Sequence, residues 1–183
     1  MSKKPKAPAT PALAILDAAG VSYRTHSYEH DAAASIGFGL ETAAVLGVDP
    51  ARVFKTLMTR VDGQLVTAVV PASGLLNLKS LAAAVGGKKA EMAAPAQAER
   101  ATGYVVGGIS PLGQKRRHRL VIDTSARHHQ TILVSGGRRG LSLELNADDL
   151  AAAAMTEVDT SSATAANVDQ GTPGVVFAPV SRA

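Results

Sequence analysis

A β-hairpin signal at residues 53–70 constrains the fold more than any other stretch of the sequence. Two runs of mainly apolar and β-branched residues, 53–59 and 64–70, flank the dipeptide Asp62-Gly63. Asp-Gly is a preferred pair for a two-residue hairpin turn, because both residues accept the positive φ that this turn requires. The sequence therefore predicts two antiparallel strands joined by a tight turn.

Helix and strand signals alternate on both sides of this hairpin. Thr10-Pro11 is a typical helix start, with Thr as N-cap and Pro in the first turn, and Gly20 is a typical stop. We expect helices at residues 11–19, 41–46, 78–85, 95–102 and 147–155, and further strands at 21–28, 104–109, 120–123, 131–134 and 141–145. Because hairpin signals are prominent, this order predicts an α/β (α+β) fold with a mixed or largely antiparallel sheet.

The chain of 183 residues is long enough for one domain with a substantial core. Residues 1–9 are read as a basic flexible tail and 10–155 as the domain. From residue 156 onward Thr, Ser, Ala, Gly, Pro and Asp dominate, so 156–183 is read as a C-terminal extension to which the sequence assigns no role. Its apolar patch, Val175–Phe177, is able to dock onto the domain.

Composition excludes several classes of site. The absence of cysteine rules out disulfides, thiolate metal sites and a cysteine nucleophile. No apolar run approaches the roughly 20 residues of a membrane span, so no membrane association is predicted and a cytoplasmic location fits. The formal net charge of +4 permits a polyanionic partner without requiring one. No metal signature involves the histidines, which we read as structural or surface residues: His26, His30, His118, His128 and His129.

The stretch from Gly103 to Arg119 is the first candidate for a ligand site. It combines Gly107-Gly108 with Pro111, and a cluster of cations follows. Glycine lets backbone N–H groups approach a ligand closely, and proline stiffens the loop. A ligand with carbonyl, hydroxyl and phosphate groups suits such a loop, and an ordinary turn beside a solvated basic face is the alternative.

Lys55 is the most unusual single residue. It lies in the middle of a predicted strand, with Val53 and Leu57 on its own face. If that face points inward, the partly buried amine needs a partner, such as a carboxyl, carbonyl or phosphate group of a ligand. The alternative is a lysine at a sheet edge with its amine in water.

Basic residues form further clusters. The turn Gly136-Gly137-Arg138-Arg139-Gly140 is suited to hold a phosphate through backbone N–H groups and guanidinium groups, with a hairpin turn carrying exposed arginines as the alternative. A nucleic-acid backbone and a solvated surface both remain open for the whole set: Lys88, Lys89, Arg116, Arg117, Arg119, Arg138 and Arg139.

Seven motifs follow one another across the domain: Thr25–Asp31, Phe38-Gly39, Phe54–Leu57, Leu76–Lys79, Lys88–Met92, Thr102–Lys115 and Val134–Leu141. In order and spacing they closely resemble the YbaK family of bacterial aminoacyl-tRNA editing enzymes, which are typically Cys-tRNA(Pro) deacylases. The resemblance covers roughly residues 10–155. It implies a mixed, mostly antiparallel and barrel-like β-sheet with peripheral helices, related to the editing insertion of bacterial prolyl-tRNA synthetases.

The resemblance also implies a function. Such a protein acts in trans on cysteine wrongly attached to tRNA(Pro), with prolyl-tRNA synthetase as a transient partner and without a metal or organic cofactor. The thiol of the substrate attacks its own ester carbonyl, so the protein supplies orientation and electrostatic stabilisation. The alternatives are a deacylase for Ala-tRNA(Pro) or another small aminoacyl-tRNA, and a non-catalytic module that binds tRNA or a synthetase.

Site residues follow from the resemblance by position. Lys55 matches the family's essential lysine, which is implied to hold the terminal adenosine phosphate or the aminoacyl end. Gly107 matches the first residue of the Gly-x-x-x-Pro loop around the aminoacyl group. The implied substrate-binding set is Tyr28, Phe38, Gly108, Ile109, Ser110, Pro111, Ser135, Gly136 and Gly137. One departure is Leu40, where the family often has an acidic residue.

Overall fold

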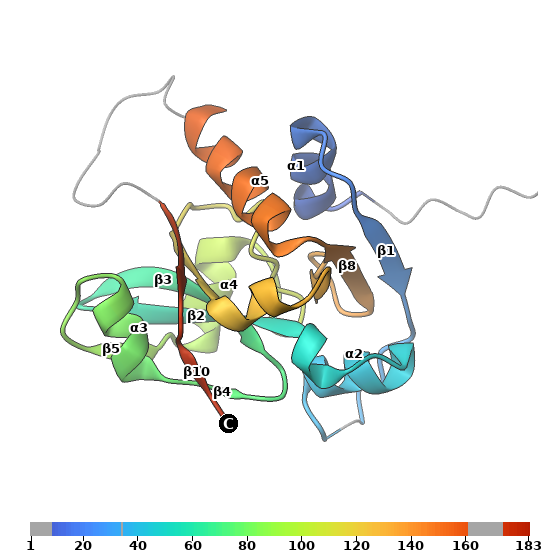
Figure 1. The fold of residues 1–183 in the computed structure, drawn as a ribbon, viewed down its shortest axis with the longest axis horizontal. Helices are drawn as coiled ribbons and strands as arrows, with labels where there is room; N and C mark the ends of the chain where they lie inside the picture. Colours follow the sequence, from blue (N-terminus) through green and yellow to red (C-terminus); the bar gives the residue numbers. More distant parts are fainter. Residues whose placement is uncertain (1–8, 34, 161–173) are drawn as a thin grey trace, which may run out of the picture.

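The β2–β3 hairpin lies inside the largest sheet of the computed structural model, which describes residues 9–33, 35–160 and 174–183 (Figure 1). Strand β2 (Phe54–Val61) pairs antiparallel with β3 (Gln64–Pro71) along their whole length. The turn residues Asp62 and Gly63 have φ angles of 48° and 87°, so both adopt the left-handed conformation that a two-residue hairpin turn requires. The predicted hairpin is confirmed.

The described strands form a mixed set of sheets in which antiparallel pairs predominate, as predicted. The largest sheet has the order β5-β2-β3-β6-β9, and β6 is parallel to both β3 and β9. A second sheet has the order β1-β8-β7, and β10 pairs with β4. One bridge, Val53 to Leu133, joins the two larger sheets. The remaining bounds are β1 Arg24–Ser27, β4 Leu75–Leu76, β5 Ala90–Met92, β6 Arg119–Asp123, β7 Ile132–Ser135, β8 Leu141–Leu145, β9 Val175–Ala178 and β10 Ser181–Arg182.

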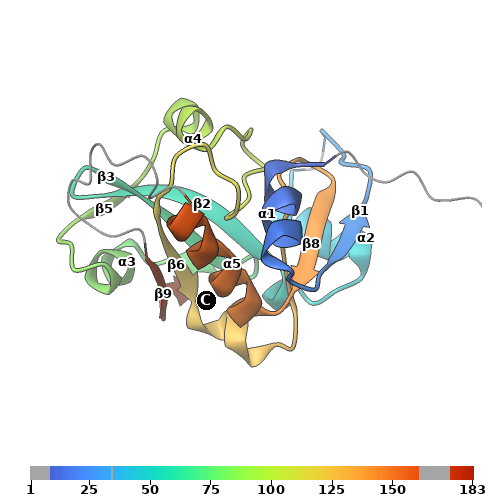
Figure 2. The same cartoon turned by 90° about the horizontal axis from the view of Figure 1, so that it is seen from above.

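Helices pack around these sheets. Helices α1 and α5 lie side by side (Figures 1 and 2). Their buried side chains share a core cluster with side chains of β6, β7 and β8. The Thr10 side chain accepts a hydrogen bond from Leu13 N, and Gly20 ends α1 with a φ of 66°. The bounds are α1 Pro11–Ala19, α2 Phe38–Leu46, α3 Leu78–Ala84, α4 Pro95–Thr102 and α5 Ala147–Thr160, with short 3-10 turns at Pro50–Arg52 and Thr124–His128.

The strand predicted at residues 104–109 is wrong, because this segment is a loop. Gly107 has a φ of 88°, which interrupts the extended backbone of a strand. Val106 N donates to Glu99 Oε1 and its carbonyl oxygen accepts from Arg139. The hydrogen bonds of the Val106 backbone are therefore made with side chains and not with a partner strand.

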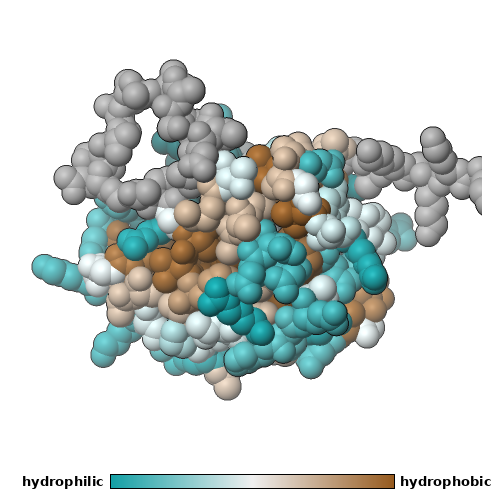
Figure 3. Space-filling model, turned by 45° about the horizontal axis from the view of Figure 1, so that its top comes forward, coloured by the Kyte–Doolittle hydropathy of each residue, from teal (hydrophilic) through white to brown (hydrophobic). Residues whose placement is uncertain are grey.

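The apolar patch in the C-terminal extension is part of the sheet. Strand β9 (Val175–Ala178) pairs with β6, and the Arg127 guanidinium lies 3.6 Å from the centre of the Phe177 ring. Apolar side chains are also exposed elsewhere on the surface, because Figure 3 shows hydrophobic areas (brown) beside hydrophilic areas (teal). No described helix is both long enough and apolar enough to cross a membrane.

Candidate active site

A cavity of about 300 Å³ lies where the two larger sheets meet. Its wall combines the start of β2, the start of α2, the loop after α4, the end of β7 and the start of β8. Elements that are far apart in the sequence therefore share one concave site. The lining includes six of the predicted site residues: Tyr28, Phe38, Lys55, Gly107, Ile109 and Ser135.

Lys55 lies near the start of β2, where it pairs with Val70 of β3, whereas β5 pairs only with residues 59–61 at the other end of the strand. Its ammonium donates to the Gly74 carbonyl oxygen at 2.9 Å. Burial lowers the pKa of Lys55 below its ordinary value, because a low-dielectric surrounding disfavours the charged form. The amine is thus partly withdrawn from water at the cavity wall, as expected for an inward-facing lysine.

Two aromatic side chains line the wall from opposite ends of one segment. The Tyr28 hydroxyl is 2.6 Å from Thr42 Oγ1, and Thr42 donates to the Phe38 carbonyl oxygen at 2.9 Å. The His30 ring and the Arg139 guanidinium each lie 5.2 Å from the centre of the Phe38 ring. With 37% of its surface exposed, Phe38 offers a flat apolar surface to a ligand.

Gly107 is the point where the loop after α4 touches the aromatic wall. A Cβ on this residue would lie 2.5 Å from Cζ of Phe38, and its φ is 88°. Both the space and the backbone conformation therefore require glycine. Val106, the preceding residue, is held on both sides by Glu99 and Arg139, so the loop has a fixed position.

The remaining residues predicted in the two loops lie behind the wall. Ser110 has no exposed surface, and its hydroxyl accepts from Leu112 N at 3.3 Å. A Cβ on Gly108 would come within 2.8 Å of the Arg138 backbone, so these loops pack against each other. The positions outside the cavity lining are Gly108, Ser110, Pro111, Gly136 and Gly137.

A network of polar side chains supports the loop at residues 107–113. Gln114 Nε2 donates to the Ser110 carbonyl oxygen at 3.0 Å, and His118 Nδ1 lies 2.8 Å from Gln114 Oε1. Burial, followed by the nearby charge of Arg116, lowers the pKa of His118 to about 4. His118 is therefore neutral at pH 7 and acts as part of the scaffold.

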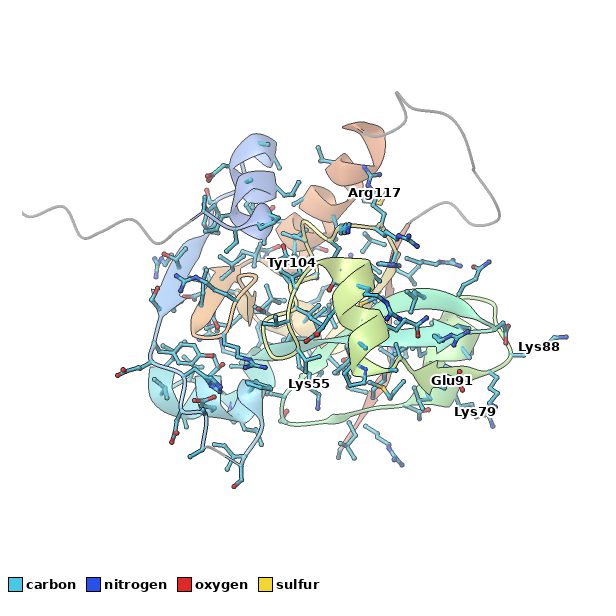
Figure 4. All side chains as sticks on the ribbon, turned by 180° about the vertical axis from the view of Figure 1, so that it is seen from behind. Lys55, Lys79, Lys88, Glu91, Tyr104 and Arg117 are labelled. Carbon is cyan, nitrogen blue, oxygen red and sulfur yellow. The ribbon has the colours of Figure 1, made fainter. Side chains whose placement is uncertain are left out.

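The predicted basic clusters lie in different parts of the molecule. Lys88 N and Lys89 N donate to the Asp62 carboxylate at the tip of the hairpin. Because a strand rises roughly 3.3 Å per residue, this tip is on the order of 20 Å from Lys55. Figure 4 shows Lys88 and Arg117 pointing away from the central Lys55 in different directions. Of these cations, Arg139 contacts the cavity wall, through Phe38 and Val106.

Several lining residues were missed by the sequence analysis. Thr42, Met58, Met92 and Ala98 all border the cavity. Phe38 and Thr42 are four residues apart on α2, and this spacing places both on one helix face. Met92 ends one of the quoted motifs, but no site role was assigned to it. For Met58 and Ala98 no sequence signal existed, because their neighbours come from distant segments.

The described part of the chain contains no group of three or more His, Asp or Glu residues that could hold a metal ion. Two of the histidines are each paired with a carboxylate instead. His26 Nε2 lies 2.7 Å from Glu144, and His30 Nδ1 lies 2.8 Å from Glu41. Both histidines therefore have a structural partner within the protein.

Comparison with known proteins gives a consistent result. The sequence profile of the family described as the aminoacyl-tRNA editing domain matches residues 39–153. A protein of Enterococcus faecalis, provisionally named a Cys-tRNA(Pro)/Cys-tRNA(Cys) deacylase, is 36% identical over 151 residues, which cover 79% of this chain and 88% of that protein. The multifunctional Ser/Thr-tRNA deacylase of Escherichia coli is 29% identical over 115 residues, covering 61% and 66% of the two chains.

A solved structure shares the fold over nearly the whole chain. It is described provisionally as a trans-editing enzyme for prolyl tRNA synthetase. The superposition has a TM-score of 0.70 and covers 97% of this chain and 98% of the other, at 18% sequence identity.

Proposed function

The chain belongs to the aminoacyl-tRNA editing domain family, and we propose that it hydrolyses misacylated tRNA, with Cys-tRNA(Pro) as its main substrate. The observation that carries the proposal is the convergence of Lys55, Gly107 and Phe38 on one cavity. A related protein provisionally named for the same substrate supports this choice. The products are free cysteine and tRNA(Pro).

The size and lining of the cavity favour a small aminoacyl group. At about 300 Å³ the cavity is at the lower end of the range for ligand pockets. Met58, Ala98 and Ile109 give it apolar walls, which suit a thiol better than a charged side chain. Phe38 at the exposed rim is in a position to stack on the terminal adenine.

Lys55 is proposed to bind the substrate and not to attack it. Its ammonium has three N–H donors, so the bond to Gly74 leaves donors for a phosphate or carbonyl oxygen. The nucleophile is the cysteine thiol of the substrate. Its sulfur forms a bond to the ester carbonyl carbon, the ester C–O bond breaks, and the thiol proton passes to the departing ribose oxygen. Water then opens the cyclic thioester to cysteine.

The contribution of the protein is orientation. A thiol and an ester on one aminoacyl group react only when the chain is folded back, and a tight cavity removes the competing conformations. The backbone of the loop around Gly107, which is held by Glu99 and Arg139 through Val106, is proposed to fix the aminoacyl group in that shape.

Outside the cavity, the proposed partners are the tRNA phosphates, which the basic residues would contact, and prolyl-tRNA synthetase. Arg139 contacts the wall, and we assign it and its neighbour Arg138 to the acceptor end of the tRNA. Arg116, Arg117, Lys88 and Lys89 are assigned to more distant phosphates. We also propose a transient complex in which prolyl-tRNA synthetase holds the tRNA. A solved structure with the same fold, described provisionally as a trans-editing enzyme for prolyl tRNA synthetase, supports this complex.

The test is to incubate the protein with Cys-tRNA(Pro) and to follow the loss of ester, with and without prolyl-tRNA synthetase. Ala-tRNA(Pro) and Ser-tRNA(Pro) are compared side by side, since serine has the shape of cysteine without the thiol. We expect cysteine to be released fastest. A rate equal to that in buffer for every substrate would leave a non-catalytic tRNA-binding module.

A second candidate is a deacylase for hydroxyl-bearing aminoacyl groups. The similarity to a Ser/Thr-tRNA deacylase favours it. Ser-tRNA and Thr-tRNA hydrolysed faster than Cys-tRNA(Pro) would establish this alternative and exclude assistance by the substrate thiol.

A further inference from the structure

The C-terminal strand β10 lies directly behind the carbonyl group that holds Lys55. Lys55 Nζ donates to Gly74 O, and Gly74 precedes β4, the partner of β10 (Figure 1). A Cβ on Gly74 would come within 2.8 Å of the Arg182 carbonyl oxygen. The two backbones are therefore in contact, and Gly74 is enclosed between Lys55 and β10.

Strand β10 needs anchors besides its pairing with β4. The pair is two residues long, Ser181 with Leu76 and Arg182 with Leu75, and so short a ladder is weak on its own. One anchor is Val180, whose side chain has no exposed surface. Its carbonyl oxygen also accepts from Asn77 N at 2.7 Å.

The other anchor is Asp123, a buried carboxylate at the end of β6. It is 2% exposed, and its Oδ2 accepts from Val180 N at 2.8 Å and from Ser181 N at 2.7 Å. Its Oδ1 accepts from the backbone and the hydroxyl of Ser125. Burial raises the pKa of Asp123, but these hydrogen bonds outweigh burial and keep the pKa below its ordinary value.

We infer that Asp123 is a positioning residue for Lys55: it fixes β10, and β10 keeps the Gly74 carbonyl where the Lys55 ammonium donates to it. The inference gives residues 174–183 a role in the site. Its consequence for catalysis rests on the proposed function, whereas its consequence for Lys55 does not.

A lysine side chain has a flexible four-carbon stem, so its ammonium is well placed only when an acceptor holds it. Gly74 is that acceptor. If β10 moves away from the Gly74 segment, the charged amine loses a hydrogen bond that stabilises it. The pKa of Lys55, already lowered by burial, then falls further.

The direct test is competitive acetylation of the folded full-length protein, read for each lysine by mass spectrometry. We expect Asp123→Asn to raise the labelling rate of Lys55 at pH 8 by roughly threefold, because a lower pKa leaves more of the amine in its reactive neutral form. Lys88, which points away from Lys55 in Figure 4 and binds Asp62 at the tip of the hairpin through its backbone, serves as the internal reference and remains unchanged.

A control variant separates positioning from general loss of stability. Ile132 is fully buried in a core cluster that does not contain Val180, so Ile132→Val lowers stability without touching β10. Its Lys55 labelling stays at the wild-type rate. An Asp123→Asn protein that melts earlier but labels Lys55 like the wild type would overturn the inference.

A second variant covers the case in which Asp123→Asn does not fold. Gly74→Ala places a Cβ against the Arg182 carbonyl oxygen and leaves Asp123 intact. The same rise in Lys55 labelling is expected, and an unchanged rate contradicts the inference. Deacylation of Cys-tRNA(Pro) is measured in parallel: if the wild type is inactive, the proposed function fails, while labelling still decides the role of Asp123.

Discussion

The two glycine-rich loops contact each other, yet they relate differently to the cavity. The loop at residues 107–113 borders it through Gly107 and Ile109, whereas the loop at 135–140 borders it through Ser135. In the first loop, the missing Cβ of Gly107 makes room for the Phe38 ring. In the second, Gly137 makes room for Tyr104 and Thr10, which belong to the scaffold.

Glycine content alone therefore does not identify a ligand loop. A positive φ occurs at Gly107 (88°) and at Gly137 (101°), and a Cβ is excluded at both. What separates them is the neighbour that fills the space, and that neighbour comes from another segment. Substitutions at loop residues that face the cavity wall should therefore change turnover, and substitutions where the loops pack against the scaffold or against each other should change stability.

The largest effect is expected at Gly107. Gly107→Ala drives a Cβ into Phe38, which displaces the cavity wall and lowers kcat/KM on the order of 100-fold, since misplacement by about 1 Å has this cost. Gly63→Ala is the matched control, because Gly63 has a φ of 87° with nothing within 4 Å of a Cβ. Equal losses of activity in both variants would show that backbone strain alone is responsible.

A different result is expected at Gly108. Gly108→Ala forces a Cβ against the Arg138 backbone, and such overpacking costs about 1–3 kcal/mol of stability. Urea denaturation should reveal this loss, while the folded protein keeps its turnover within a few-fold. Lost turnover at unchanged stability would contradict the assignment and make Gly108 a direct contact of the substrate.

A smaller effect is expected at Arg139. Arg139→Ala removes the cation over the Phe38 ring and the donors to the Val106 carbonyl oxygen. Because an exposed cation–π contact contributes about 0.5–1 kcal/mol, we expect KM to rise roughly twofold to fivefold at pH 7. Arg127→Ala, which breaks the contact with Phe177 away from the cavity, is the comparison. An equal KM change in both would remove Arg139 from the site.

The smallest effect concerns cations outside both loops. Arg116→Gln combined with Arg117→Gln should lower the slope of log Kd against log salt by about 1.5–2, if each residue neutralises one phosphate. Deacylation at low salt and saturating tRNA should change little. A salt slope equal to that of the wild type would exclude these two arginines from the tRNA interface.

Local signals explain which parts of the fold were predictable. The hairpin around Asp62-Gly63 and the helix between Thr10 and Gly20 depend on turn and cap residues within the element, and both are confirmed. The loop at 104–109 was predicted as a strand because it is apolar. Glu99 and Arg139 hold this segment out of the sheets, and neither contact is visible in the local pattern.

The site was predictable to a similar degree. Motif resemblance led to Lys55, Phe38 and Gly107, and the structure places all of them on one cavity. It did not lead to Asp123 or Gly74, because their link to Lys55 depends on strand pairing across more than 100 residues of sequence. Tertiary contacts of this kind leave no periodic or turn signal.

Single-turnover hydrolysis of Cys-tRNA(Pro) by the wild type and by Lys55→Ala decides whether Lys55 binds the substrate. The measurement is made at equal protein concentration, with circular dichroism to verify that both proteins are folded. If Lys55 holds the aminoacyl end in the cavity, the wild type deacylates well above the buffer rate and Lys55→Ala falls close to it. A folded Lys55→Ala protein that deacylates as fast as the wild type would contradict the account.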